Sequence, residues 1–353
     1  MTDYVELHCR SAFSFLRGAS TPEQLVRRAA ELQMPTIGLC DRDGLYGAPR
    51  LFKEAKDHGV RPIVGAELTI PADGQQTILP VLVQSRRGYE NLCQLLTRAH
   101  LRNEKGKCSV GWDELPEFAE GLVALAGHNV VAASRQSDAV LPGKILRRSA
   151  EAPLRHVERL INTFGRENVF IELQRHRIRG EEKRICSLVD LAEHLHLPLL
   201  ATNGVVYASE LQRPVLDVFT CIRRHTHLDA AGQLLEQNGE RHLKNAKQMR
   251  ELFRDLPEAI NNTMRLAERL DFTLENLGYE FPSFPIPPHH TVDSFLREKA
   301  LEGARWRYQH RGEVRSLETS WTGISYGFAG GDDSTTTGSP SGTCNTGFMT
   351  WRL

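Results

Sequence analysis

The sequence predicts an α/β fold with mainly parallel strands, followed by a helical segment and a tail without regular structure. Three observations predict this. Short apolar segments alternate with amphipathic ones over residues 1–208, helical patterns then continue without strands, and the composition changes abruptly near Arg311. Alternation of this kind is typical of sheets covered by helices.

The strand pattern recurs seven times. Each occurrence is a short run rich in Val, Ile and Leu, as expected for a buried strand. The runs lie at residues 4–9, 36–41, 61–68, 77–84, 121–127, 169–174 and 197–202. Their separation by helix-length segments favours parallel pairing, in a closed or an open sheet.

Amphipathic helix patterns fill the intervals between these runs. The first starts near Ser20, an N-cap candidate, and has Pro22 early, where proline is tolerated. The second spans residues 48–58 and is followed by Gly59, a C-cap candidate. Further helices are predicted at residues 89–101, 153–164 and 181–195.

Three segments follow the alternating region. Residues 209–275 show helical patterns only, and residues 276–310 combine a proline-rich stretch, GYEFPSFPIPPHH, with the first helix of a further domain. Serine, threonine and glycine make up twenty of the 32 residues from Thr319 to Thr350. Such a segment cannot bury enough apolar surface to offset its chain entropy. We therefore expect residues 311–353 to form a disordered tail or an out-of-frame translation that truncates the chain.

Composition excludes several classes of protein. The formal net charge is zero, so a nucleic-acid role would need a local basic patch or a further part of the protein. The seven cysteines include no CxxC pair, which is typical of reduced thiols in the cytoplasm. No run approaches the roughly 18–20 apolar residues of a membrane span, and the start lacks signal-peptide features. We expect a cytoplasmic protein without membrane contact.

Polar residues stand where several predicted strands end. They are His8, Asp41, Glu67, His128 and Asn203. The carboxyl ends of parallel strands meet at one edge of a sheet, where active sites of α/β proteins lie. Two interpretations stay open from this pattern: a clustered site, or unrelated loop residues.

Several longer motifs occur in one order along the chain. They read ELHCRSAFSFLRGAS, IGLCDRDGLYGAPRLFKEAKDHGVRPIVGAEL, GYENLCQLLTRAHL, FIELQRH and LPLLATNGVVYA, followed by FRDLPEAINNT. Over roughly residues 4–308 they resemble the PHP (polymerase and histidinol phosphatase) domain at the front of bacterial DNA polymerase III alpha subunits. SFLRGAS after LHC, and ATNG in place of ATND, resemble the error-prone, damage-tolerant branch. The resemblance implies a distorted (β/α)7 barrel over residues 1–208.

The resemblance also implies a dismantled metal site. In hydrolytic PHP domains, His, Asp, Glu and Cys side chains hold up to three metals, which activate water and bind phosphate oxygens. The positions divide into three vestigial ligands, His8, Asp41 and Glu67, and four lost ligands, Arg10, Arg42, Gly204 and Val206. Ile78 and Leu79 stand where a further histidine is expected, and His128 is a candidate replacement for another ligand.

Arg10 and Arg42 would each place a permanent charge where a cation sits. At about 4 Å, like charges repel by roughly 1 kcal/mol in water and several-fold more in a partly buried site. Either guanidinium could instead pair with Asp41 or Glu67 through bidentate hydrogen bonds. We predict such a network in preference to a residual single-metal site. We also expect no catalytic residue and no cofactor in this chain. Mg²⁺ is implied only for the full-length polymerases.

The resemblance implies that full-length relatives are error-prone DNA-directed DNA polymerases in replication, repair and translesion synthesis. Nucleotidyl transfer in them belongs to a palm domain that follows everything seen here. We expect this chain alone to be monomeric and inactive, with DNA and other replication or mutagenesis factors bound through the missing polymerase body. Three alternatives remain: a phosphoesterase with a reduced ligand set, a non-catalytic interaction module, and a non-functional truncated product.

Other polar pairs have weaker patterns. One pair lies in a loop, one on different faces of a helix, one after prolines and one in the tail. A solvated position is therefore the favoured interpretation for these residues. They are His225 with His227, His194 with His196, His289 with His290, and Asp332 with Asp333.

Overall fold

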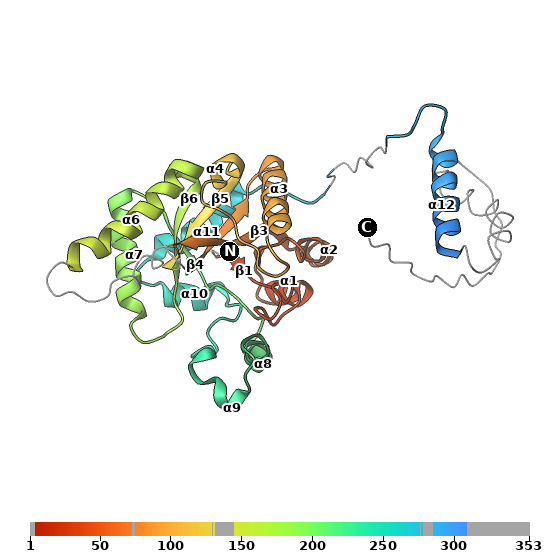
Figure 1. Ribbon diagram of the computed structural model, residues 1–353. Helices are drawn as coiled ribbons and strands as arrows, with labels where there is room; N and C mark the ends of the chain where they lie inside the picture. The colour runs from red at the N-terminus through yellow and green to blue at the C-terminus, as the bar shows by residue number, and fades with distance from the viewer. Residues whose placement is uncertain are drawn as a thin grey trace. The chain divides into compact units, whose positions relative to one another are not determined.

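The computed structural model describes residues 4–72, 75–128, 130, 145–275, 277 and 285–308. Two compact units divide the chain, Met1–Leu277 and Gly278–Leu353. The second unit contains the helix α12, Val292–Tyr308, near the predicted start at Thr291 (Figure 1). The predicted tail at 311–353 lies outside the described residues.

Seven strands form one sheet in sequence order, at the positions predicted from the apolar runs. They are β1 (Glu6–Cys9), β2 (Thr36–Arg42), β3 (Arg61–Ala72), β4 (Gln75–Val83), β5 (Leu122–Ala126), β6 (Val169–Gln174) and β7 (Leu199–Thr202). The sheet curves into a nearly closed barrel. Val205, just after β7, donates its N–H to the carbonyl of His8 at 2.9 Å and accepts from the N–H of Arg10 at 2.8 Å.

Strand β4 is the exception to parallel pairing, because it runs antiparallel to both β3 and β5. The other four neighbouring pairs are parallel. Ala72 pairs with Gln75 across a two-residue connection. A parallel crossover needs roughly a dozen residues or more, so this short connection imposes a hairpin.

Helices cover the outside of the barrel (Figure 1). Helix α1 begins after Thr21, one residue later than expected, because Thr21 and Gln24 form a capping box. Helix α2 ends at Gly59, whose φ of 64° is the left-handed conformation of a glycine C-cap. The helices of the first unit are α1 (Pro22–Glu31), α2 (Ala48–His58), α3 (Arg86–Arg102), α4 (Leu115–Phe118), α6 (Ile145–Phe164), α7 (Glu181–Leu195), α8 (Arg213–Arg224), α9 (Leu228–Ala231), α10 (Ala246–Leu252) and α11 (Pro257–Arg269).

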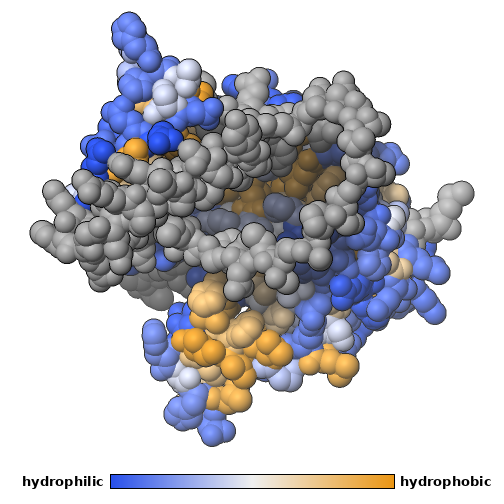
Figure 2. All heavy atoms as spheres, turned by 90° about the vertical axis from the view of Figure 1, so that its right-hand side faces the viewer, coloured by the Kyte–Doolittle hydropathy of each residue, from blue (hydrophilic) through white to orange (hydrophobic). Residues whose placement is uncertain are grey.

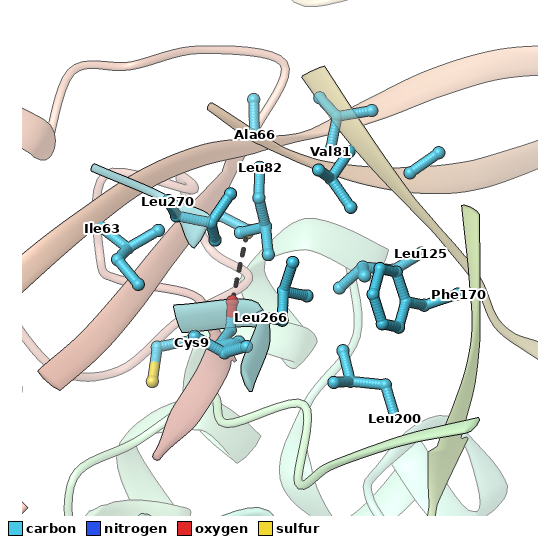
Figure 3. Close-up of a cluster of buried hydrophobic side chains, with 14 of the residues drawn as sticks. Cys9, Ile63, Ala66, Val81, Leu82, Leu125, Phe170, Leu200, Leu266 and Leu270 are labelled. Atoms are coloured by element: carbon cyan, nitrogen blue, oxygen red, sulfur yellow. Dashed lines mark hydrogen bonds between the residues drawn. The ribbon is translucent and has the colours of Figure 1, made fainter. Parts of the chain in front are cut away.

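Helix α11 closes the end of the barrel at which the strands begin. Leu266 of α11 and Leu270, just after it, are buried among barrel side chains such as Ile63 and Phe170 (Figure 3). Asn262 donates to the carbonyl of Leu199, at the start of β7, at 2.8 Å. The helical segment therefore packs into the same unit as the strands, and the carboxyl ends of the strands remain available for a site.

Helix α8 and the short 3₁₀ turn before it, Glu210–Gln212, carry a row of exposed aliphatic side chains. Their spacing of four, three and four residues places them along one face of the helix. Figure 2 shows apolar residues gathered toward the bottom of the molecule, the level at which α8 and α9 lie in Figure 1. The row consists of Leu211, Val215, Val218 and Ile222. No helix in the described part of the chain has the length and apolar character to cross a membrane.

Candidate functional site

A pocket of about 360 Å³ opens at the carboxyl ends of the strands. Polar side chains from β1, β3 and β6 meet there, namely His8, Glu67 and Glu172. Arg10 and Arg42 line the same pocket. The clustered site is thus the correct interpretation of the strand-end pattern for His8 and Glu67.

Glu67 is the centre of this site. Arg10 binds it through both carboxylate oxygens, with Nε to Oε2 at 3.1 Å and Nη2 to Oε1 at 2.5 Å. Arg42 donates from Nε to Oε2 at 2.7 Å, and Nε2 of His8 lies 2.9 Å from Oε1. The predicted arginine–carboxylate network is therefore confirmed at Glu67. Burial would raise the pKa of Glu67, but the charges of Arg10, Arg42 and His8 hold that pKa well below its usual range.

His8 bridges two carboxylates across the barrel. Its Nδ1 lies 2.6 Å from Oε1 of Glu172, and its Nε2 contacts Glu67. Burial lowers the pKa of His8, but the charges and hydrogen bonds of Glu172 and Glu67 outweigh burial and raise the pKa to about 9. At neutral pH both ring nitrogens therefore carry protons, and the imidazolium is a third cation beside Glu67.

Asp41 belongs to a separate set of contacts. Ser11 donates to it from its backbone N–H at 2.8 Å and from its hydroxyl, and the hydroxyl of Ser14 donates at 2.7 Å. Burial raises the pKa of Asp41, although these donors oppose the rise. Of the two carboxylates expected as alternative partners of the guanidiniums, Asp41 is not used, because the serines of the loop after β1 already occupy both of its oxygens.

Glu172 is a site residue that sequence reasoning missed. It lies in β6 and is 3% exposed. Besides His8 it accepts hydrogen bonds from the hydroxyl of Thr202 at 2.5 Å and from Nε2 of Gln174 at 3.0 Å. The available signal was its position inside the apolar run VFIELQ, because a carboxylate in a buried strand needs partners.

Two lost-ligand positions contribute backbone groups in place of side chains. The carbonyl of Gly204 accepts from Nε of Arg241 at 3.0 Å and from Nη2 at 2.7 Å. The N–H of Val206 donates to the carbonyl of Arg241. Gly204 has a φ of 51°, and a Cβ added there would lie 2.6 Å from Oε1 of Gln174. Gln174 fills the space that a side chain at position 204 would need.

Restoring an aspartate at position 204 should therefore destabilise the protein. We expect Gly204→Asp to lower the free energy of unfolding by about 1–2 kcal/mol, because a side chain at positive φ is strained. It also displaces Gln174 from Glu172. Urea unfolding measures the change, and the same substitution in a Gln174→Ala background should cost less. Equal costs in both backgrounds would contradict the crowding by Gln174.

The remaining candidates lie elsewhere or act structurally. His128 lines the pocket, whereas the side-chain amide of Asn203 donates to the carbonyls of Glu240 and His242. His225 and His196 are helix C-caps with positive φ. Asp332 and Asp333 lie outside the described residues.

The site residues do not fit a metal ion. Both nitrogens of His8 contact carboxylates, and the oxygens of Glu67 accept hydrogen bonds from three cationic side chains. Within the part of the chain that the structure describes, no group of three or more His, Cys, Asp and Glu side chains is arranged to hold a metal. The ion pairs of this arrangement can hold together the ends of β1, β2, β3 and β6.

Known proteins resemble this chain in a domain family, in sequence and in structure. Residues 6–176 match the PHP domain family. An error-prone DNA polymerase of Anaeromyxobacter dehalogenans is 39% identical over 286 residues, which cover 80% of this chain and 24% of that protein. One from Bradyrhizobium diazoefficiens is 35% identical over 309 residues, which cover 85% and 25%. An amidohydrolase structure from Chromobacterium violaceum is similar with a TM-score of 0.38 at 14% identity, covering 57% of this chain and 86% of that one. The chain spans about a quarter of the length of the curated relatives it matches.

Proposed function

We propose that this chain, which carries a PHP domain and is homologous to the N-terminal part of error-prone DNA polymerases, is a non-hydrolytic domain of such a polymerase. It holds no catalytic metal and no catalytic residue of its own. The observation that supports this is the state of Glu67, whose oxygens accept hydrogen bonds from Arg10, Arg42 and His8. Their positive charge would repel a metal ion from that carboxylate.

The network then has a structural role. Arg10 and His8 come from β1 and its end, Arg42 from β2, Glu67 from β3 and Glu172 from β6. The ion pairs therefore join strands on both sides of the closure between β1 and β7. Fixed cations of the chain neutralise carboxylates in the position that metals occupy in hydrolytic relatives, so the barrel keeps its shape without a bound ion.

In this proposal DNA synthesis belongs to the part of the relatives that the chain does not match, together with the Mg²⁺ that polymerase chemistry uses. DNA and other replication or mutagenesis factors are then its partners through the polymerase body, and the cytoplasm is its compartment. The six cysteines in the described region are all free thiols, which agrees with a reducing compartment.

Metal content tests the proposal directly. We expect elemental analysis of the purified chain to find substoichiometric zinc, manganese and iron, and we expect a chelator to leave the thermal midpoint unchanged. The matched variant is Arg10→His with Arg42→His, which removes two cations from Glu67 and adds two imidazoles. It should gain metal that the chelator removes. Stoichiometric tight metal in the unaltered chain would overturn the proposal.

Hydrolysis assays separate the proposal from the phosphoesterase alternative. We expect the chain to leave bis-p-nitrophenyl phosphate intact with or without added Mn²⁺, and to incorporate no nucleotide in primer extension. Hydrolysis that is abolished both by chelator and by Asp41→Asn would establish a reduced metal site instead.

A further inference from the structure

Two arginines outside the Glu67 network, Arg17 and Arg223, form no ion pair within the described part of the chain. Arg17 lies in the loop after β1, and Arg223 lies in the last turn of α8. Among the described residues, no carboxylate oxygen lies within 4.0 Å of either guanidinium, whereas Arg10 and Arg42 are both paired. Nε of Arg223 is buried and has no hydrogen-bond partner in that part of the chain. A buried guanidinium nitrogen without a partner is costly.

The fold brings together the segments that carry these two arginines. Ala19, two residues beyond Arg17, donates its N–H to the carbonyl of Val206 at 2.8 Å and packs beside Leu216 of α8. Nη1 of Arg10 donates to the carbonyl of Arg17 at 3.3 Å. The loop after β1 and helix α8 thus share one surface beside the paired arginines.

The charges around the two arginines bear on the pKa of each. Burial lowers the pKa of Arg17, and the charges of Arg42, Arg223 and Arg10 lower it further, to about 10, although the charge of Asp43 opposes the shift. Burial also lowers the pKa of Arg223, as do the charges of Arg224, Arg10 and Arg42, against the opposing charge of Glu236. Unpaired like charges held together are unfavourable in the free protein, and an anion placed between them would remove that cost.

An exposed aromatic ring lies in the same loop as Arg17. Phe15 is two residues before Arg17 and is 79% exposed. Single-stranded nucleic acids bind where a basic groove meets aromatic rings, because each base can stack and each phosphate needs a cation. A free phosphate or pyrophosphate would use the arginines but not the ring.

We propose that Arg17 and Arg223 hold a backbone phosphate of single-stranded nucleic acid, with a neighbouring base stacked on Phe15. This goes beyond the proposed function, in which contact with DNA belongs to the polymerase body. The sequence did not show the patch, since Arg17 and Arg223 stand 206 positions apart and the chain has no net charge.

Fluorescence anisotropy with a labelled oligothymidylate tests the site in the full chain. We expect saturable binding that weakens with salt. Arg17→Gln with Arg223→Gln should weaken binding about tenfold and reduce the salt slope by about 0.7, the value for one phosphate contact on a single strand. Phe15→Ala should also weaken binding about tenfold through lost stacking. A duplex of the same length should bind more weakly and be indifferent to Phe15→Ala.

Matched variants control for charge and exposed apolar area. Arg86→Gln with Arg98→Gln removes two arginines of α3 that are paired with Glu90 and Glu117. Leu211→Ala removes an apolar side chain that is 89% exposed. Both variants should bind as the unaltered chain does. The Arg17/Arg223 double variant should keep or raise the thermal midpoint, because it relieves repulsion, so its loss of binding cannot be ascribed to unfolding.

Three outcomes would overturn the inference. They are no strand binding at low salt, unchanged affinity and slope in the Arg17/Arg223 variant, and full displacement of the strand by an equimolar amount of pyrophosphate. The last outcome would identify a small-anion site. None of them bears on metal content, so failure here is distinguishable from failure of the proposed function.

Discussion

The Glu67→Gln variant should lose about 3–5 kcal/mol of unfolding free energy, the range found when one partner of a buried ion pair is removed. Glu67 is 1% exposed and is the shared partner of Arg10, Arg42 and His8. Glutamine preserves the volume but removes the charge, so three cations would face one another with Glu172 as the nearest remaining carboxylate on His8.

Urea unfolding at pH 7 measures this effect. Glu90→Gln, which breaks an exposed pair with Arg86 on α3, is the matched control and should leave the midpoint unchanged. Adding Arg10→Met to Glu67→Gln should recover part of the lost stability, because the double variant removes a cation together with its partner. A Glu67→Gln protein as stable as the unaltered chain would show that the network does not hold the barrel.

Stability should also fall as pH rises through the titration of His8. The pKa of His8 is about 9 in the folded protein, against about 6.5 for an unperturbed histidine. A raised folded-state pKa means that the native state holds the proton more tightly than the unfolded chain. The contribution is therefore fully present below pH 6.5 and lost by about pH 9, and it amounts to about 3 kcal/mol at 1.36 kcal/mol per pKa unit.

The measurement is the difference in unfolding free energy between the unaltered chain and His8→Gln at several pH values. This difference should shrink steadily between pH 6.5 and 9.5. His176→Gln is the control, because burial, assisted by Arg241, lowers the pKa of His176 to about 4. Its contribution changes only below pH 6.5, so its difference should be flat over the alkaline range. A His8 difference that is equally flat would show that the imidazole is neutral.

Part of the fold and of the site could be predicted from the sequence. The seven strands were predictable because apolar runs of β-branched and aliphatic residues recur between helical periods, and Gly59 marked a helix end through its conformational freedom. The antiparallel pairing of β4 was not predicted, although the two-residue connection before this strand required a hairpin. Glu172 was overlooked because one carboxylate in an apolar run has no local partner to reveal its role.

By itself, the sequence determined the order of strands and helices and the residue types at the positions where the resemblance implies metal ligands, since both depend on local pattern and on position within motifs. Only the tertiary structure decided which carboxylate the guanidiniums bind. Arg10 and Arg42 meet at Glu67 because Ser11 and Ser14 already occupy Asp41. It also brought the loop that carries Arg17 beside the helix that carries Arg223, and it placed His8 between Glu67 and Glu172. The physical reason is that these partners come from distant segments, which strand pairing and the closure of the barrel between β1 and β7 bring together.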